Sequence, residues 1–124
     1  MKPKTVIKED EDLDKAGIIS IDDFAKVKLR TGEITACKKI KKSKKLLKIQ
    51  VDDERGGRQI VSGIAEYYTP EELVGKQVLV LVNLEPRELK GILSRGMILM
   101  AQDASGKLRL LQPDDQTNPG ATVG

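Results

Sequence analysis

The sequence has no histidine, no tryptophan and a single cysteine, Cys37, among its 124 residues. Without histidine, no side chain has an ordinary pKa near neutral pH, which removes the commonest general base. One cysteine cannot form an intramolecular disulfide, and without histidine a soft metal would find too few ligands. We therefore expect no catalytic residue, no metal site and no cofactor in this chain.

Cys37 permits two interpretations. The neighbouring Lys38 and Lys39 could lower the pKa of its thiol and make it reactive. Alternatively, Cys37 is a small buried residue of a strand, and the absence of any partner imidazole favours this second interpretation.

Long hydrophobic runs are also missing. No apolar stretch approaches the ~20 residues that a membrane-spanning helix needs. The first ten residues are charged and contain no apolar segment of the kind found in signal peptides. We expect a soluble cytoplasmic protein that does not enter a membrane.

The net charge of +3 conceals an uneven distribution. Residues 24–58 hold twelve Lys or Arg against four Asp or Glu, whereas residues 1–23 and 59–124 both carry an excess of acids. Such a basic block favours a polyanionic partner, although a merely solvated lysine-rich face is the alternative. The strongest candidates lie in one stretch without acids: Lys38, Lys39, Lys41, Lys42, Lys44, Lys45 and Lys48. Because lysine presents a point charge, these residues are suited to phosphates rather than to base edges.

A second basic segment runs from Glu85 to Gly96. It adds Arg87, Lys90 and Arg95 as candidate contacts, together with Ser94, which could also tie the segment by hydrogen bonds. The alternative is a structural corner that precedes a strand.

Aromatic residues are scarce, with only Phe24, Tyr67 and Tyr68. Proteins that grip single-stranded nucleic acid stack bases on exposed rings. Phe24 is expected to anchor a short helix, capped by Ser20 or Asp22, against the body. At least one tyrosine is expected to pack beside a second helix. Too few rings remain for stacking, so the residues favour a folded RNA recognised by shape and charge.

The chain is predicted to be all-β, with strands where apolar residues alternate with polar ones. The predicted strands cover residues 27–36, 47–52, 59–64, 76–84 and 97–101, and Leu108, Leu110 and Leu111 add a last one. Thr69, Pro70 and Gly75 indicate a short helix before the fourth strand, with Thr69 as its N-cap.

Five strands with a helix between the third and fourth are typical of an OB-fold barrel. We expect residues 1–20 to form a flexible leader or interdomain linker. Residues 21–124 then form the barrel with short helices and a C-terminal extension. The small size of the chain and the apolar Leu108, Leu110 and Leu111 near an otherwise polar terminus predict that this extension serves dimerisation.

Several segments together resemble the tRNA-binding domain at the C-terminus of methionyl-tRNA synthetases, and the related free-standing bacterial tRNA-binding proteins. The resemblance extends from about Ile21 to Val123. It rests on the segments 23–32, 45–47, 58–64, 83–84 and 94–97, on the motif Asn-Leu-x-Pro-x-x-Leu-x-Gly from Asn83, and on Ser94-Arg95-Gly96-Met97.

The resemblance implies a non-catalytic module that binds tRNA by its structure, forms a homodimer and raises the tRNA affinity of a synthetase whose other part aminoacylates. It favours the first-hairpin lysines and the loop 94–97 for RNA contact. The family often has His-Pro-x-Ala-Asp where this chain has Lys41-Lys42-Ser43-Lys44, so lysines replace the usual loop chemistry. Two alternatives remain: a protein-interaction or chaperone-like dimeric module, and a single-stranded DNA binder.

Overall fold

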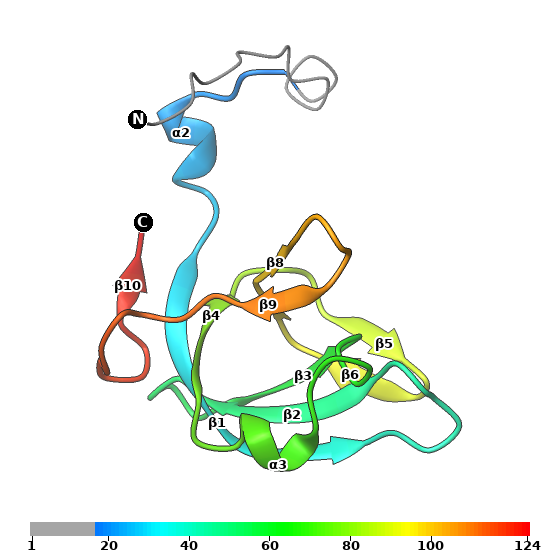
Figure 1. Cartoon of the computed structure of the whole chain (residues 1–124). Helices are drawn as coiled ribbons and strands as arrows, with labels where there is room; N and C mark the ends of the chain where they lie inside the picture. Colours follow the sequence, from blue (N-terminus) through cyan, green and yellow to red (C-terminus); the bar gives the residue numbers. More distant parts are fainter. Residues whose placement is uncertain (1–16) are drawn as a thin grey trace, which may run out of the picture.

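The computed structural model of the chain describes residues 17–124 (Figure 1). Within them, no helix is long and apolar enough to cross a membrane. The two described helices are α2 (Ile21–Phe24) and α3 (Pro70–Leu73). The strands are β1 (Leu29–Lys39), β2 (Leu47–Asp52), β3 (Arg58–Ser62), β4 (Gln77–Leu81), β5 (Arg87–Leu89), β6 (Ile92–Ser94), β7 (Met97–Ile98), β8 (Met100–Gln102), β9 (Leu108–Leu110) and β10 (Thr122–Val123). Most of the predicted leader over residues 1–20 lies outside the described residues.

The long strand β1 organises the main sheet, whose strand order is β3-β2-β1-β4-β7, with β10 also paired to β1. The first half of β1 pairs with β4 and the second half with β2. A register shift between Ile34 and Ala36 lets the strand bend between its two partners. Gly32 lies just before this bend, where an added Cβ would come within 2.3 Å of the Val51 side chain. Only glycine fits there without displacing the core.

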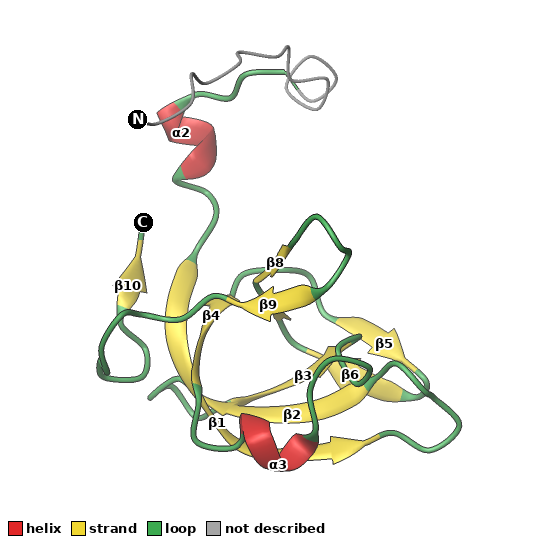
Figure 2. Ribbon diagram, in the orientation of Figure 1, coloured by secondary structure: helices red, strands yellow, loops and turns green. Residues whose placement is uncertain are grey.

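The open edge of the sheet is closed by the segment that follows β5. Arg95 donates its backbone N–H to Gln59 O at 2.8 Å, and Val61 donates its backbone N–H to Ser94 Oγ at 2.9 Å. The strands thus curl into a nearly closed barrel (Figure 2). The predicted all-β, OB-like architecture is confirmed, with α3 between the third and fourth strands.

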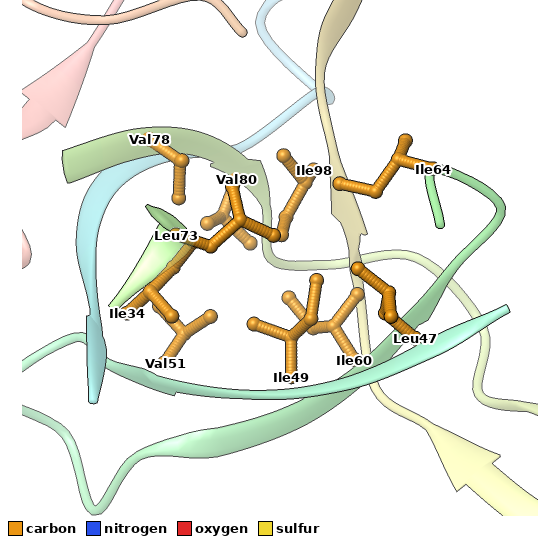
Figure 3. Packing of buried hydrophobic residues seen from close by; sticks show 10 residues of the cluster. All are labelled: Ile34, Leu47, Ile49, Val51, Ile60, Ile64, Leu73, Val78, Val80 and Ile98. Carbon is orange, nitrogen blue, oxygen red and sulfur yellow. The ribbon is translucent and has the colours of Figure 1, made fainter. Parts of the chain in front are cut away.

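The barrel interior holds ten buried aliphatic side chains that point toward one another (Figure 3). They are Ile34, Leu47, Ile49, Val51, Ile60, Ile64, Leu73, Val78, Val80 and Ile98. Alternation in β2 buries Leu47, Ile49 and Val51 and turns the intervening residues outward, as the sequence predicts. Each such side chain contributes about 1.5–3 kcal/mol when fully removed from water.

Helix α3 begins and ends where the sequence predicts. Thr69 Oγ1 accepts from Glu72 N, and the Glu72 carboxylate accepts from Thr69 N in return. Pro70 occupies the first helical turn, and Gly75 follows the helix with a φ of 92°. Leu73 is fully buried, so this single turn closes one end of the barrel.

Three predictions about local structure were wrong. The capping of α2 by Ser20 is confirmed, but α2 projects away from the barrel (Figure 1), leaving Ile21 77% and Phe24 37% exposed. The predicted fifth strand is split into β7 and β8, since β7 pairs with β4 whereas β8 pairs with β9. The predicted loop 85–96 contains the β5–β6 hairpin instead.

The C-terminal segment folds back onto β1 and β4. Thr31 Oγ1 donates to Asn118 O at 2.9 Å and accepts from Ala121 N at 3.0 Å, and Thr31 is only 3% exposed. Gln77 likewise pairs with the backbone of Thr117. Of the apolar residues predicted for dimerisation, Leu108 and Leu110 pack against the barrel's own core. Leu111 remains 36% exposed.

Candidate nucleic-acid interface

The segment of residues 38–48, here called the lysine loop, joins β1 to β2 at one end of the sheet. Lys39 pairs with Leu47, and Leu47 pairs with Ser62. The last residue of β1, the first of β2 and the last of β3 therefore lie together. This lysine end of the sheet is opposite to the β2–β3 turn.

The β5–β6 hairpin, residues 87–94, reaches toward the same end. Arg95 lies beside Gln59 and Ser94 beside Val61, so β6 runs antiparallel to β3. The tip of the hairpin at Lys90 therefore extends toward the Ser62 end of β3. In the view of Figure 1, the β5–β6 hairpin and the loop between β1 and β2 both lie on the right of the barrel. Two basic segments, residues 38–48 and 87–94, thus extend toward the same end of the sheet although they are separate in sequence.

The lysine loop has its own internal structure. Ile40 is buried, Ser43 Oγ accepts from Leu46 N at 3.1 Å, and Ala65 N donates to Lys45 O at 2.9 Å. These contacts hold the backbone while the cationic heads remain in solvent. The exposed residues are Lys38, Lys39, Lys41, Lys42, Lys44 and Lys45, and Lys48 is half-buried. Among residues 17–124, the salt bridges are Lys26–Asp23, Arg58–Asp53 and Arg109–Asp103, so none neutralises the loop.

The hairpin adds three exposed cations, Arg87, Lys90 and Arg95. Arg87 pairs with Ser94 at the base of the hairpin, whereas Lys90 lies in its turn. Arg95 follows β6, next to β3. The structure therefore places one predicted residue at the tip and two near the base.

Ser94 differs from the other predicted site residues because it is only 5% exposed. Its hydroxyl accepts from Val61 N and donates to Gly96 O at 3.3 Å. The hydroxyl therefore uses both its acceptor and its donor within the fold, and the Ser94 side chain fastens the hairpin to β3. Asn83 performs a comparable task, since it accepts from Lys28 N and donates to Lys26 O.

Sequence reasoning missed the ion pair that holds the base of this surface. Arg58 Nε donates to Asp53 Oδ2 at 2.9 Å, and the same guanidinium donates to Val82 O and Arg95 O at 3.0 and 2.9 Å. Arg58 thereby ties the start of β3 to the segments on either side of the hairpin. No local pattern predicts this, because the acceptor carbonyls lie 24 and 37 residues further along the chain.

The Asp53 carboxyl is 1% exposed. Burial acts to raise its pKa, but the hydrogen bonds and charge of Arg58, with the backbone N–H groups of Arg55 and Gly57, outweigh burial. The pKa of Asp53 consequently lies below its ordinary value. The pair is a permanent structural charge pair at neutral pH.

Cys37 lies half-buried in β1. Burial, followed by the negative charge of Glu71, raises the pKa of the Cys37 thiol to about 11. The structural interpretation of this residue is thus favoured, and its lysine neighbours do not lower the pKa. Among the described residues there is also no cluster of three potential metal ligands.

The aromatic side chains do not form a track. Tyr68 packs against the core, and its hydroxyl accepts from Leu110 N at 3.2 Å, with Lys76 Nζ 5.6 Å from the ring centroid. Tyr67 is 38% exposed, and Phe24 lies on the projecting arm. The described surface therefore offers charge but no row of stacking platforms.

Two methionine–tRNA ligases illustrate the similarity to known sequences. The enzyme of Porphyromonas gingivalis is 53% identical over 105 residues, which cover 85% of this chain and 15% of the relative. The enzyme of Archaeoglobus fulgidus is 50% identical over 115 residues, which cover 93% of this chain and 17% of the relative. The chain thus spans about one sixth of the length of these relatives.

Solved structures agree with this similarity. A MetRS-related protein from Pyrococcus horikoshii superimposes with a TM-score of 0.83 at 37% identity, covering 87% of this chain and 99% of that one. The chaperone CsaA of Bacillus anthracis superimposes with a TM-score of 0.78 at 26% identity, covering 87% of this chain and 100% of that one. Residues 29–122 match the family described as "Putative tRNA binding domain". By sequence and by fold, this chain belongs to that tRNA-binding-domain family.

Proposed function

We propose that this module binds folded tRNA through the lysine end of its barrel, by contacts to phosphates rather than to bases. One observation carries the proposal. The lysine loop and the tip of the β5–β6 hairpin project exposed, unneutralised cations from the same end of the sheet. A rigid barrel that presents cations from two converging loops is suited to the paired backbones of a folded RNA.

The type of side chain supports recognition by shape. All seven candidates in the loop are lysines, which bind phosphate as point charges and lack the planar fork with which arginine, asparagine and glutamine pair with base edges. Arg87 and Arg95 are the only arginines among the candidates. Because phosphate contacts release counterions, each engaged phosphate should steepen the dependence of log K on log salt by about 0.7–0.9.

The test is binding of labelled tRNA over a salt series, with single-stranded RNA and duplex DNA as competitors. Selective binding of tRNA that weakens steeply with salt is the expected result. Equal competition by all three nucleic acids would contradict recognition of folded tRNA.

In the wider chain, we propose that the module raises the tRNA affinity of a methionyl-tRNA synthetase whose catalytic part performs aminoacylation. Identity of about 50% to methionine–tRNA ligases supports this context. The module's contribution is binding, not catalysis. Fusing or adding it to the catalytic part should lower KM for tRNA while leaving the methionine activation rate unchanged.

We further propose that the module acts as a homodimer. The predicted C-terminal leucines are largely used by the barrel itself, but apolar side chains are exposed along the arm that contains α2. Their exposures are 95% for Ile18, 60% for Ile19, 77% for Ile21 and 40% for Val27. A second copy that covers this arm would remove the exposed apolar surface from water. Sedimentation equilibrium should give the dimer mass, and a concentration-independent monomer would contradict the proposal.

A chaperone-like or other protein-binding role is the competing function, and the similarity to the CsaA structure is the observation in its favour. The same apolar arm could then bind unfolded clients. Suppression of aggregation of a denatured test protein, together with absent tRNA selectivity, would favour this second function.

A further inference from the structure

Two lysines of the basic surface adopt a backbone conformation that lysine disfavours. Among the described residues other than glycine, positive φ occurs at Lys42 (65°), Glu54 (59°) and Lys90 (52°). Lys42 lies in the lysine loop and Lys90 in the turn of the β5–β6 hairpin, both toward the lysine end of the sheet. In this left-handed region the Cβ of an L-residue crowds its own backbone, so glycine, asparagine and aspartate are preferred.

The hairpin turn shows the conflict most clearly. Leu89 pairs with Ile92, which leaves Lys90 and Gly91 as a two-residue turn with φ values of 52° and 79°. Positive φ at both central residues defines a type I′ turn, for which Asn-Gly and Asp-Gly are the favoured sequences. Gly91 satisfies the second position, but lysine stands where asparagine would fold better.

Folding does not account for either lysine. Both side chains are exposed, and neither head group makes a hydrogen bond or salt bridge within residues 17–124. Lys42 follows Lys41 in a turn whose fastening comes from Ser43 and Ile40 rather than from lysine. What each lysine adds to its exposed turn is a positive charge.

We propose that Lys42 and Lys90 are the two tip contacts that engage the phosphodiester backbone of the RNA, and that both turns sacrifice folding stability for this contact. The inference rests on the proposed function and deepens it, because it selects two of the candidates. Strained left-handed residues are known to persist at ligand-binding positions for this reason. A local rule broken at two tips of one surface is the pattern expected of a binding site.

Replacing either lysine by asparagine should therefore change stability and binding in opposite directions. We expect Lys42→Asn and Lys90→Asn each to raise Tm by about 3–6 °C, measured without RNA. Each should also weaken tRNA binding about three- to tenfold at about 0.1 M salt and reduce the salt slope by about 0.7–0.9.

Three controls separate charge from backbone. Lys44→Asn removes a charge from the same loop at a residue without positive φ, so binding should weaken with no gain in Tm. Lys107→Asn removes an exposed charge from the β8–β9 turn and should leave binding within about twofold. Lys90→Arg keeps the charge in the strained turn and should retain binding without raising Tm.

The outcomes distinguish this inference from the proposed function. If the parent module binds tRNA selectively but the two asparagine variants bind equally well, the tip contacts are refuted and the general function stands. If Tm fails to rise in both variants, the trade-off is refuted. If the parent module shows no selective tRNA binding, the proposed function itself fails, and this inference fails with it.

Discussion

The ion pair between Arg58 and Asp53 gives a stringent test of how the barrel holds its basic surface. Arg58→Met keeps much of the aliphatic stem but removes the guanidinium that bonds Asp53, Val82 O and Arg95 O. The variant leaves a carboxylate that is 1% exposed without its counter-charge. Breaking a buried pair in this way typically costs about 3–5 kcal/mol. The Arg58 side chain is 16% exposed, which places the expected loss at about 3 kcal/mol.

For a domain of this size, such a loss should lower Tm by more than about 10 °C. Differential scanning calorimetry on the parent and Arg58→Met measures it directly. The double variant with Asp53→Asn should be more stable than Arg58→Met alone. The neutral amide oxygen that Asp53→Asn introduces can still accept hydrogen bonds from Arg55 N and Gly57 N, as the Asp53 carboxylate does in the parent. Additive losses from the two single substitutions, or a loss below about 1 kcal/mol for Arg58→Met, would refute the reasoning.

Three further predictions concern the same framework. Because the pKa of Asp53 is lowered in the folded state, the stability that it contributes is present at neutral pH and is lost as pH falls below about 4. Urea unfolding should show that the difference in free energy of unfolding between the parent and Arg58→Met becomes smaller as the pH is lowered. A difference that does not change with pH would contradict the assignment. Thr31→Val removes the hydroxyl that is hydrogen-bonded to Asn118 O and Ala121 N, so it should lower the free energy of unfolding by about 1–3 kcal/mol. It should also speed amide hydrogen exchange in residues 118–121, and unchanged exchange would argue against this anchor. The Cys37 thiol, with a pKa of about 11, should react with iodoacetamide at pH 8 far more slowly than a free thiol, and a rate equal to that of glutathione would show that it is not protected.

The sequence predicts the parts of the fold that rest on local patterns. Alternation in residues 47–52 identifies both the strand and its buried face, because a half-buried strand needs this period. Thr69, Pro70 and Gly75 mark helix α3, because capping and turn chemistry act within a few residues. Five strands with a helix between the third and the fourth then indicate the OB-fold.

Features that depend on contacts across the barrel are not visible locally. Strands β5 and β6 have three residues each and β10 has two, too few for alternation to appear. Arg58 looks like one more cation of the basic block, and only its distant carbonyl acceptors reveal a structural role. Ser94 looks like an exposed loop residue until the backbone N–H of Val61 is found opposite it.

The candidate surface shows the same division. Composition identifies the lysine loop, since seven lysines without an acid stand out in any sequence. Strand register is needed to show that the tip of the hairpin extends toward the same end, and φ angles are needed to single out Lys42 and Lys90. Helix α2 was predicted to pack against the barrel because Ile21 and Phe24 are apolar. The local sequence, however, does not specify which surface such apolar side chains contact, and both are exposed.

The most direct test of the central claim compares two charge-matched variants in a tRNA-binding salt series. One variant carries Lys41→Glu and Lys44→Glu in the lysine loop. The control carries Arg55→Glu and Lys107→Glu, which are also exposed but lie in the β2–β3 and β8–β9 turns. The loop variant should bind tRNA more than about tenfold more weakly at about 0.1 M salt, with a shallower salt slope, while the control stays within about threefold of the parent. Equal weakening in both variants would show that the attraction follows net charge alone, and would contradict a defined binding surface at the lysine end.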